Sequence, residues 1–261
     1  MNAEKGLTNC YLCGQLADIR ESHIIPDWVY RDELRGDGGK VVSADSGIVR
    51  YVPAYTHPLL CSDCEQRFSK WENPAKLFAR QAGSAYGDWL FPFATSISWR
   101  VLNWFLLNPE ELSDEGKSLL RNPEVDESLS CWRDFLLYGR LGEASKRHRQ
   151  HLFLRSPDYP LRNMACMYVG TDGTHWFTYA QFSYYGILGL IKSSNPKALQ
   201  KSAIQVAGGE LLSVAFMTPN LYQKLQGIEI ERLRQAVVCG KELTARQLRK
   251  ESRQNRKNHP S

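Results

Sequence analysis

The chain has 261 residues, of which 43% are apolar and 11% are aromatic. This length and composition are sufficient to bury a true hydrophobic core, which excludes a wholly disordered chain. The sequence holds no run of about eighteen apolar residues, and its first residues lack the apolar segment of a secretory signal. We therefore expect a soluble, cytoplasmic protein that makes no membrane contact.

The positive charge is concentrated in one segment. The formal net charge is +5, and residues 241–261 alone contain seven Lys and Arg residues against two Glu residues. The rest of the chain is therefore formally neutral. The basic tail, residues 246–261, either attracts phosphate groups without sequence preference or is a solvated end that favours solubility.

Seven cysteines occur along the chain, and only four of them stand at close spacing. An odd number with two close pairs is typical of reduced thiols rather than of a disulfide framework. We interpret the other three, Cys131, Cys166 and Cys239, as small buried hydrophobic residues.

The first segment, residues 1–73, is predicted to form a small module. Residues 41–43 and 48–52 are rich in β-branched side chains and flank a turn-forming run, which predicts a hairpin. Ser62 or Asp63 can cap a helix that begins near Cys64. Asn73-Pro74 is typical of the end of that helix and the start of another.

The remaining chain is predicted to form a larger α+β domain of helices and an antiparallel sheet, residues 74–245. To about residue 145 apolar residues recur at helical spacing, and the clearest stripe, from Trp99 to Leu106, ends at Asn108-Pro109. Residues 182–191 alternatively form a buried helix. Residues 219–251 are predicted to be helical before a frayed end. Aromatic and branched runs predict strands at 151–154, 164–169, 176–191, 203–206 and 211–216.

Two Cys-x-x-Cys pairs, Cys10/Cys13 and Cys61/Cys64, are separated by 47 residues. Each pair can form a tight knuckle, and together they can place four thiolates tetrahedrally around one Zn²⁺. Gly14 follows the first pair, where tolerance of positive φ lets the backbone turn back towards the metal. Four thiolates leave no open position, so we predict a structural zinc site. A thioredoxin-like redox motif needs only one such pair and leaves the other unexplained.

The residues around these pairs carry a family resemblance. The run Glu21-Ser22-His23-Ile24-Ile25-Pro26 follows the first pair, and the second pair stands within Leu59-Leu60-Cys61-Ser62-Asp63-Cys64-Glu65. Over about residues 8–75 this combination resembles the zinc-ribbon-stapled subset of the HNH endonucleases. The resemblance implies a small zinc-stapled ββα-metal module at residues 1–73 that cleaves phosphodiester bonds with Mg²⁺ or Mn²⁺.

The resemblance also implies roles for individual residues. His23 corresponds to the general base that takes a proton from the attacking water. Glu65 corresponds to a metal ligand, and its carboxylate suits Mg²⁺. Ser22 stands where the family has an Asp or His ligand. His57 and Thr56 are the residues nearest to the position of the family's Asn.

These departures from the family pattern leave two outcomes open. Either Glu21, Asp63 or a residue of the larger domain completes the catalytic metal site, or the module is an inactive descendant. We interpret Glu72, further along the predicted helix, as a solvated or capping residue. His148 lies in the basic run Lys146-Arg147-His148-Arg149, which either contacts phosphate or forms a solvated loop.

The sequence therefore predicts a metal-dependent endonuclease that cleaves nucleic acid, DNA in the first place, with His23, Glu65 and His57 as candidate catalytic residues. The resemblance to compact bacterial proteins of this build implies a role in defence against phage or other foreign DNA. The main alternative is a non-catalytic zinc-ribbon protein that binds nucleic acid or a protein partner. A third makes the larger domain the functional part, with the zinc module as a scaffold or oligomerisation device.

Overall fold

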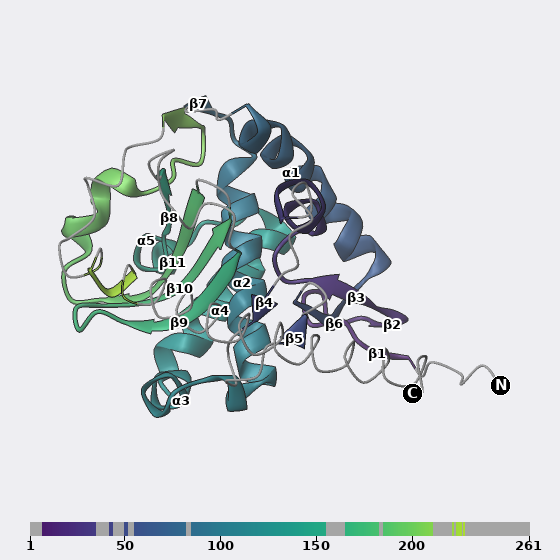
Figure 1. The fold of residues 1–261 in the computed structure, drawn as a ribbon, viewed down its shortest axis with the longest axis horizontal. Helices are drawn as coiled ribbons and strands as arrows, with labels where there is room; N and C mark the ends of the chain where they lie inside the picture. Colours follow the sequence, from purple (N-terminus) through teal and green to yellow (C-terminus); the bar gives the residue numbers. More distant parts are fainter. Residues whose placement is uncertain are drawn as a thin grey trace, which may run out of the picture.

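The computed structural model describes residues 7–34, 42–43, 50–51, 55–81, 85–154, 165–182, 185–210, 221, 223–225 and 227. Its elements are helices and antiparallel strands, which confirms the predicted α+β class. In Figure 1, helix α2 (Leu90–Leu107) runs between a four-stranded sheet on one side and the strands β3 (Ile19–His23) and β6 (Thr56–Cys61) on the other. The cysteine pairs and the large sheet therefore lie on opposite sides of α2.

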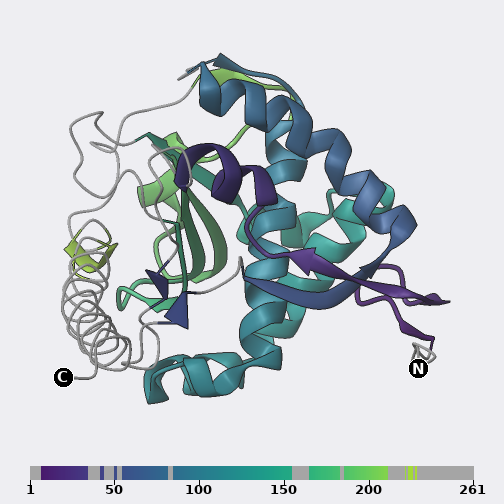
Figure 2. The same cartoon turned by 45° about the vertical axis from the view of Figure 1, so that its right-hand side comes forward.

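A ββα unit forms the N-terminal side of the molecule. Strands β3 and β6 are antiparallel, with Ile19 opposite Cys61 and His23 opposite Thr56, and α1 (Ser62–Arg80) follows β6 directly. Strand β3 ends three residues before Pro26, and a π-helical segment, Val29–Leu34, follows. Figure 2 shows α1 starting at the cysteine end of this strand pair and running back on one side of it, in contact with both strands.

Two short strand pairs accompany this unit. Strands β1 (Thr8–Asn9) and β2 (Leu16–Ala17) are antiparallel and flank the first cysteine pair. Strands β4 (Val42–Ser43) and β5 (Arg50–Tyr51) pair antiparallel, which confirms the predicted hairpin. Its turn lies outside the described residues.

Helix α1 begins one or two residues earlier than its predicted caps indicate. Its N-cap is Cys61, which makes no side-chain capping hydrogen bond, so the predicted caps Ser62 and Asp63 are wrong. Cys64 lies in the first turn, as expected. The start of the helix is therefore set by the strand and the cysteine cluster rather than by a capping side chain.

The predicted end of this helix at Asn73-Pro74 is wrong as well, because α1 continues through Pro74 to Arg80. A proline inside a helix lacks the backbone N–H and costs about 3 kcal/mol. Beyond it, Ala75 and Phe78 are buried in the main core, and this burial keeps the helix intact. The predicted module boundary after residue 73 thus falls inside a continuous helix.

The helical region from residue 85 to residue 147 is built around α2. Residues 90–105 of α2 are all buried, and the helix contacts α1, another helix and every strand of the four-stranded sheet. It ends at Asn108, as predicted. The elements around it are β7 (Ala85–Tyr86), a 3₁₀ turn (Pro109–Glu111), α3 (Asp114–Leu120), α4 (Pro123–Tyr138) and α5 (Glu143–Arg147).

The four-stranded sheet has the order β8-β11-β10-β9, with every neighbouring pair antiparallel. Residues 185–191 lie in a strand, so the alternative of a buried helix is wrong. Residues 203–206 form only a bridge from Ala203 to His151, and residues 211–216 lie outside the described part. The strands are β8 (Gln150–Leu154), β9 (Cys166–Thr171), β10 (His175–Phe182) and β11 (Tyr185–Ser193), followed by a 3₁₀ helix (Pro196–Ser202) and β12 (Gly209–Glu210).

One hydrophobic core joins the cysteine pairs to the sheet. It extends without interruption from Cys10 through Phe68 of α1, Trp99 of α2 and Trp132 of α4 to Ile187 of β11. A second, smaller cluster includes Phe153 and other residues on the sheet. The proposed module, residues 1–73, therefore shares its core with the rest of the chain.

Some predictions lie outside the described residues. These are the basic tail, residues 246–261, Cys239 and nearly all of the helix predicted at 219–251. Among the described residues, no helix combines the length and the apolar character that crossing a membrane requires.

Candidate functional site

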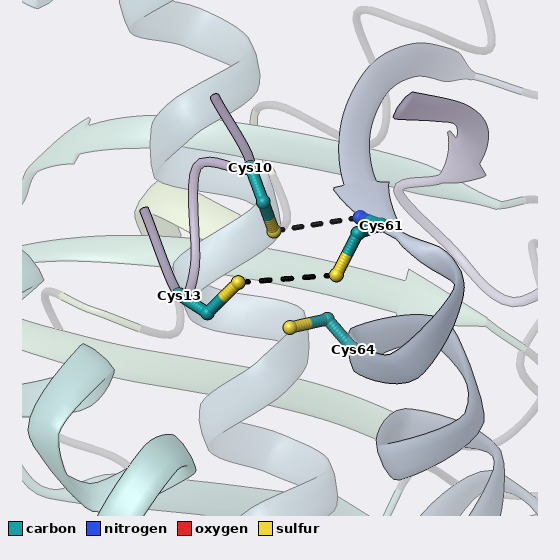
Figure 3. A group of neighbouring side chains, drawn as sticks. All are labelled: Cys10, Cys13, Cys61 and Cys64. Atoms are coloured by element: carbon teal, nitrogen blue, oxygen red, sulfur yellow. Dashed lines mark hydrogen bonds between the residues drawn. The ribbon is translucent and has the colours of Figure 1, made fainter. Parts of the chain in front are cut away.

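The two cysteine pairs converge on one point, as Figure 3 shows. Cys10 and Cys13 lie in the turn between β1 and β2, Cys61 ends β6, and Cys64 lies in the first turn of α1. The four sulfur atoms lie within 4.8 Å of one another, and the Sγ atoms of Cys13 and Cys61 are 3.8 Å apart. Tetrahedral zinc with bonds of about 2.3 Å requires a sulfur separation of about 3.8 Å. The cluster can therefore bind a metal such as zinc.

Backbone hydrogen bonds shape the first knuckle. Gly14 has a φ of +76°, and its N–H donates to the Cys10 carbonyl over 2.8 Å. This left-handed conformation favours glycine and closes the tight turn. The Tyr11 N–H donates to the Leu59 carbonyl of β6 over 3.0 Å, and the Cys61 N–H donates to the Cys10 sulfur over 3.4 Å. The two pairs are thus held together by backbone contacts as well as by their shared position.

One thiol of the cluster is prepared for deprotonation. A hydrogen bond from the Cys64 thiol, assisted by backbone N–H groups, lowers the pKa of Cys10 to about 4 although burial opposes the shift. Donating that hydrogen bond raises the pKa of Cys64, and burial raises the pKa of Cys13. A metal binds thiolates, so its arrival displaces the remaining protons.

His23 lies at the opposite end of β3 from the cysteine cluster. Its Nε2 lies 3.4 Å from Oδ1 of Asp27, and its side chain is 35% exposed. Asp27 also forms an ion pair with Arg31. A carboxylate beside an imidazole fixes the orientation of the ring. The structure thus pairs the predicted base with a carboxylate four residues further along the chain, at a position that no sequence motif marked.

A buried charge pair supports the backbone of His23. Arg100 of α2 has a side chain that is only 2% exposed, and its guanidinium donates to the His23 carbonyl over 2.7 Å and to Oε1 of Glu72 over 2.8 Å. It also lies 5.2 Å from the centre of the Phe68 ring. The interpretation of Glu72 as a solvated or capping residue is therefore wrong. An arginine inside the otherwise apolar stripe of α2 was the sequence signal for this pair.

The other predicted catalytic residues do not join His23. Ser22 is buried, and its hydroxyl donates to the Arg20 carbonyl over 3.3 Å. Glu65 lies next to Cys64 at the cysteine end of the strands, and His57 pairs across the strands with Ser22. Among the described residues, no cluster of three or more metal-ligating side chains includes His23, His57 or Glu65. Glu72 of α1, instead of Glu65, is linked to His23 through Arg100.

Three of the remaining predicted residues can be placed in the structure. Cys166 is buried, as predicted, whereas Cys131 is only half-buried. Burial raises the pKa of Cys131 to about 11, so its thiol is unreactive. In the basic run that includes His148, Lys146 and Arg147 are exposed, but His148 is buried, so the solvated-loop interpretation does not describe this histidine.

Comparison with known proteins found no matching family model, no matching curated protein and no matching solved structure. The resemblance to HNH endonucleases therefore stays a prediction from the sequence.

Proposed function

We propose that the protein is an endonuclease-type phosphodiesterase in which His23 is the general base and the four cysteines form a structural zinc site. The observation that carries the proposal is the position of His23. It ends the first strand of a ββα unit held by the cysteine cluster, it is 35% exposed, and its Nε2 lies 3.4 Å from the carboxylate of Asp27. The proposed substrate is nucleic acid, DNA in the first place.

In the proposed reaction a water molecule attacks the scissile phosphate. The neutral imidazole of His23 accepts one proton from the water, whose oxygen bonds to phosphorus while the bond to the departing 3′ oxygen breaks. That oxygen takes a proton from solvent. The negative charge of Asp27 stabilises the imidazolium formed in this step, and Arg100 holds the backbone of His23 in place.

A hard cation such as Mg²⁺ supplies charge neutralisation at phosphate in enzymes of this class. Glu65, the ligand predicted for it, does not converge on His23, and Ser22 stands in place of the family's other ligand. Asp27 is the carboxylate that lies beside the imidazole. No step of the proposed reaction therefore runs through a bound cation, and the dependence of cleavage on Mg²⁺ or Mn²⁺ stays a prediction.

The separation of the predicted cation ligand from His23 favours a second candidate function. In this alternative the protein is a non-catalytic zinc-ribbon protein that binds nucleic acid or a protein partner. The buried Ser22 and the separation of Glu65 from His23 along the unit are what a module without a catalytic cation would have. In that case the cysteine cluster holds a binding surface, and His23 is a half-exposed residue of it.

The test is a cleavage assay on the zinc-loaded full-length protein. Plasmid DNA, single-stranded DNA and RNA are incubated with Mg²⁺, with Mn²⁺ or with EDTA, and zinc content is measured after each incubation. The variants are His23→Ala and Asp27→Asn, with His57→Ala to test the other predicted histidine. Loss of a positioned base lowers the rate by roughly 10²-fold or more, so His23→Ala should do so while zinc content stays unchanged.

Asp27→Asn should reduce cleavage less than His23→Ala, and His57→Ala should stay within a few-fold of the wild type. A wild-type protein that cleaves nothing with any cation, or a His23→Ala variant that cleaves as fast as the wild type, would overturn the nuclease proposal. Retained binding of nucleic acid in that situation would support the binding protein instead.

A further inference from the structure

His148 is a buried histidine with one nitrogen already committed. It follows α5, its side chain is fully buried, and its Nδ1 lies 3.3 Å from the carbonyl of Leu190. A carbonyl only accepts hydrogen bonds, so Nδ1 carries the hydrogen and Nε2 presents a lone pair. The indole of Trp132 donates to the His148 carbonyl over 2.9 Å, which fixes the backbone at this point.

The second nitrogen of His148 points to two carboxylates of α4. Nε2 is buried and has no hydrogen-bond partner among the described residues, and it lies 3.9 Å from Oε2 of Glu127. Glu124 precedes Glu127 by one helical turn, and the ligand atoms of the three side chains lie within 4.8 Å of one another. A buried nitrogen lone pair with no donor is costly unless something fills the space beside it.

Two basic side chains form ion pairs with the carboxylates of Glu124 and Glu127. Arg147 forms an ion pair with Oε1 of Glu127, and Nζ of Lys192 lies 3.7 Å from Oε1 of Glu124. Outer groups of this kind orient ligating carboxylates in known metal sites.

We propose that Glu124, Glu127 and His148 form a second metal site, which binds a divalent transition-metal ion of the Mn²⁺ or Zn²⁺ class. One imidazole and two carboxylates suit such ions, and ligand bonds of about 2.0–2.2 Å can bridge the observed separations after small side-chain movements. Glu124 also lines a pocket with Arg149, Lys192 and Lys197. The basic groups of this pocket would hold an anion such as phosphate beside the ion.

This site is separate from the cysteine cluster and from His23, so it does not depend on the proposed function. The probe is Mn²⁺, because hard Mn²⁺ ions bind poorly to the soft thiolates that hold zinc. Free Mn²⁺ is followed by electron paramagnetic resonance during titration of the zinc-loaded full-length protein. The expected result is one Mn²⁺ per chain bound at this site, in addition to any ion bound near His23.

The variants are Glu127→Gln and His148→Gln, and the matched control is Asp126→Asn. Asp126 is an exposed residue between the two glutamates on α4, and its substitution removes the same charge. Losing one ligand should weaken Mn²⁺ binding by roughly 10-fold or more, and the control should bind as the wild type does. Glu127 lies on the surface side of the site, whereas His148 is buried. The Glu127→Gln variant therefore remains informative if the His148→Gln variant fails to fold.

A wild-type protein that binds no Mn²⁺, or a Glu127→Gln variant that binds it as tightly as Asp126→Asn, would overturn the proposal. So would loss of the bound Mn²⁺ in Asp27→Asn instead, because that result would place the ion at His23.

Discussion

At the residue scale, the buried charged and imidazole groups differ in whether hydrogen-bond partners compensate their burial. The charge of Arg100 is met by Glu72, by the His23 carbonyl and by the Ser96 carbonyl, so its burial is compensated. His151 of β8 is fully enclosed, and its Nε2 has no hydrogen-bond partner among the described residues. Its Nδ1 lies 3.1 Å from the hydroxyl of Ser202, and its ring stacks on Phe153. Protonation of this ring therefore has no compensating acceptor.

The burial of His151 predicts that the protein loses stability in mild acid. Burial lowers the pKa of His151 to about 3 in the folded protein, whereas the ordinary value is 6.5. Between these values the unfolded chain binds a proton that the folded protein does not, so the free energy of unfolding falls as the pH falls, by up to about 1.4 kcal/mol per pH unit. The pKa of His148 is also lowered, and it acts in the same direction.

Urea unfolding at pH 7.5, 6.5 and 5.5 measures this slope. His151→Gln removes the titrating group and should reduce the slope below pH 6.5, while His57→Gln, at a half-buried position on β6, should leave it unchanged. Equal slopes in the wild type and in His151→Gln would contradict the assignment.

At the element scale, the close approach of α2 to the sheet depends on a position without a side chain. A Cβ atom at Gly189 of β11 would lie 2.4 Å from the Ser98 hydroxyl and 2.7 Å from that of Thr178. Ser98 donates to Gln150 of β8 over 2.6 Å, so the helix is hydrogen-bonded to the sheet at the same level. Neither neighbour can move away without breaking packing or a buried hydrogen bond.

Gly189→Ala should therefore lower the free energy of unfolding by about 1–3 kcal/mol, the usual cost of overpacking a core. The control is Gly142→Ala, in the loop before α5, where a Cβ atom would meet nothing within 4 Å. That substitution should stay within about 0.5 kcal/mol of the wild type. Thermal unfolding compares the three proteins, and equal transition temperatures would mean that α2 can shift on the sheet at no cost.

At the scale of the whole molecule, the cysteine cluster and the sheet belong to one packed body. The core is continuous from Cys10 to the sheet, and the guanidinium of Arg133 on α4 donates to the Leu12 carbonyl in the first knuckle over 2.6 Å. Arg67 of α1 donates to the carbonyls of Leu136 and Leu137 at the end of α4. Loss of a metal bound by the cysteine cluster should therefore destabilise more of the chain than the first 73 residues.

Cys61→Ser should abolish zinc binding and lower the stability of the whole chain by several kcal/mol, because structural zinc contributes folding free energy directly. Hydrogen exchange should show reduced protection in α2 and α4 as well as in β3 and β6. The control Cys131→Ser changes a half-buried cysteine outside the cluster and should cost far less. Protection lost only before residue 74 would instead support an independent module.

The sequence by itself determined those features that depend on residues close together in the chain. The paired Cys-x-x-Cys spacing with Gly14 predicted the cluster, because knuckle geometry depends on a few consecutive residues. Apolar spacing predicted α2 and its end at Asn108, and turn signals predicted the antiparallel strands. These inferences needed no knowledge of what packs against each element.

Tertiary structure decided which groups meet, because those contacts join residues far apart in the chain. Burial against α2 carries α1 through Pro74, which local propensity alone would not allow. Packing places Arg100 between Glu72 and His23 and leaves Glu65 at the cysteine end of the strands. The proximity of His148 to the glutamates of α4 likewise depends on how α4 packs against the sheet. Burial of apolar surface, and not closeness in the sequence, sets the distance between these side chains.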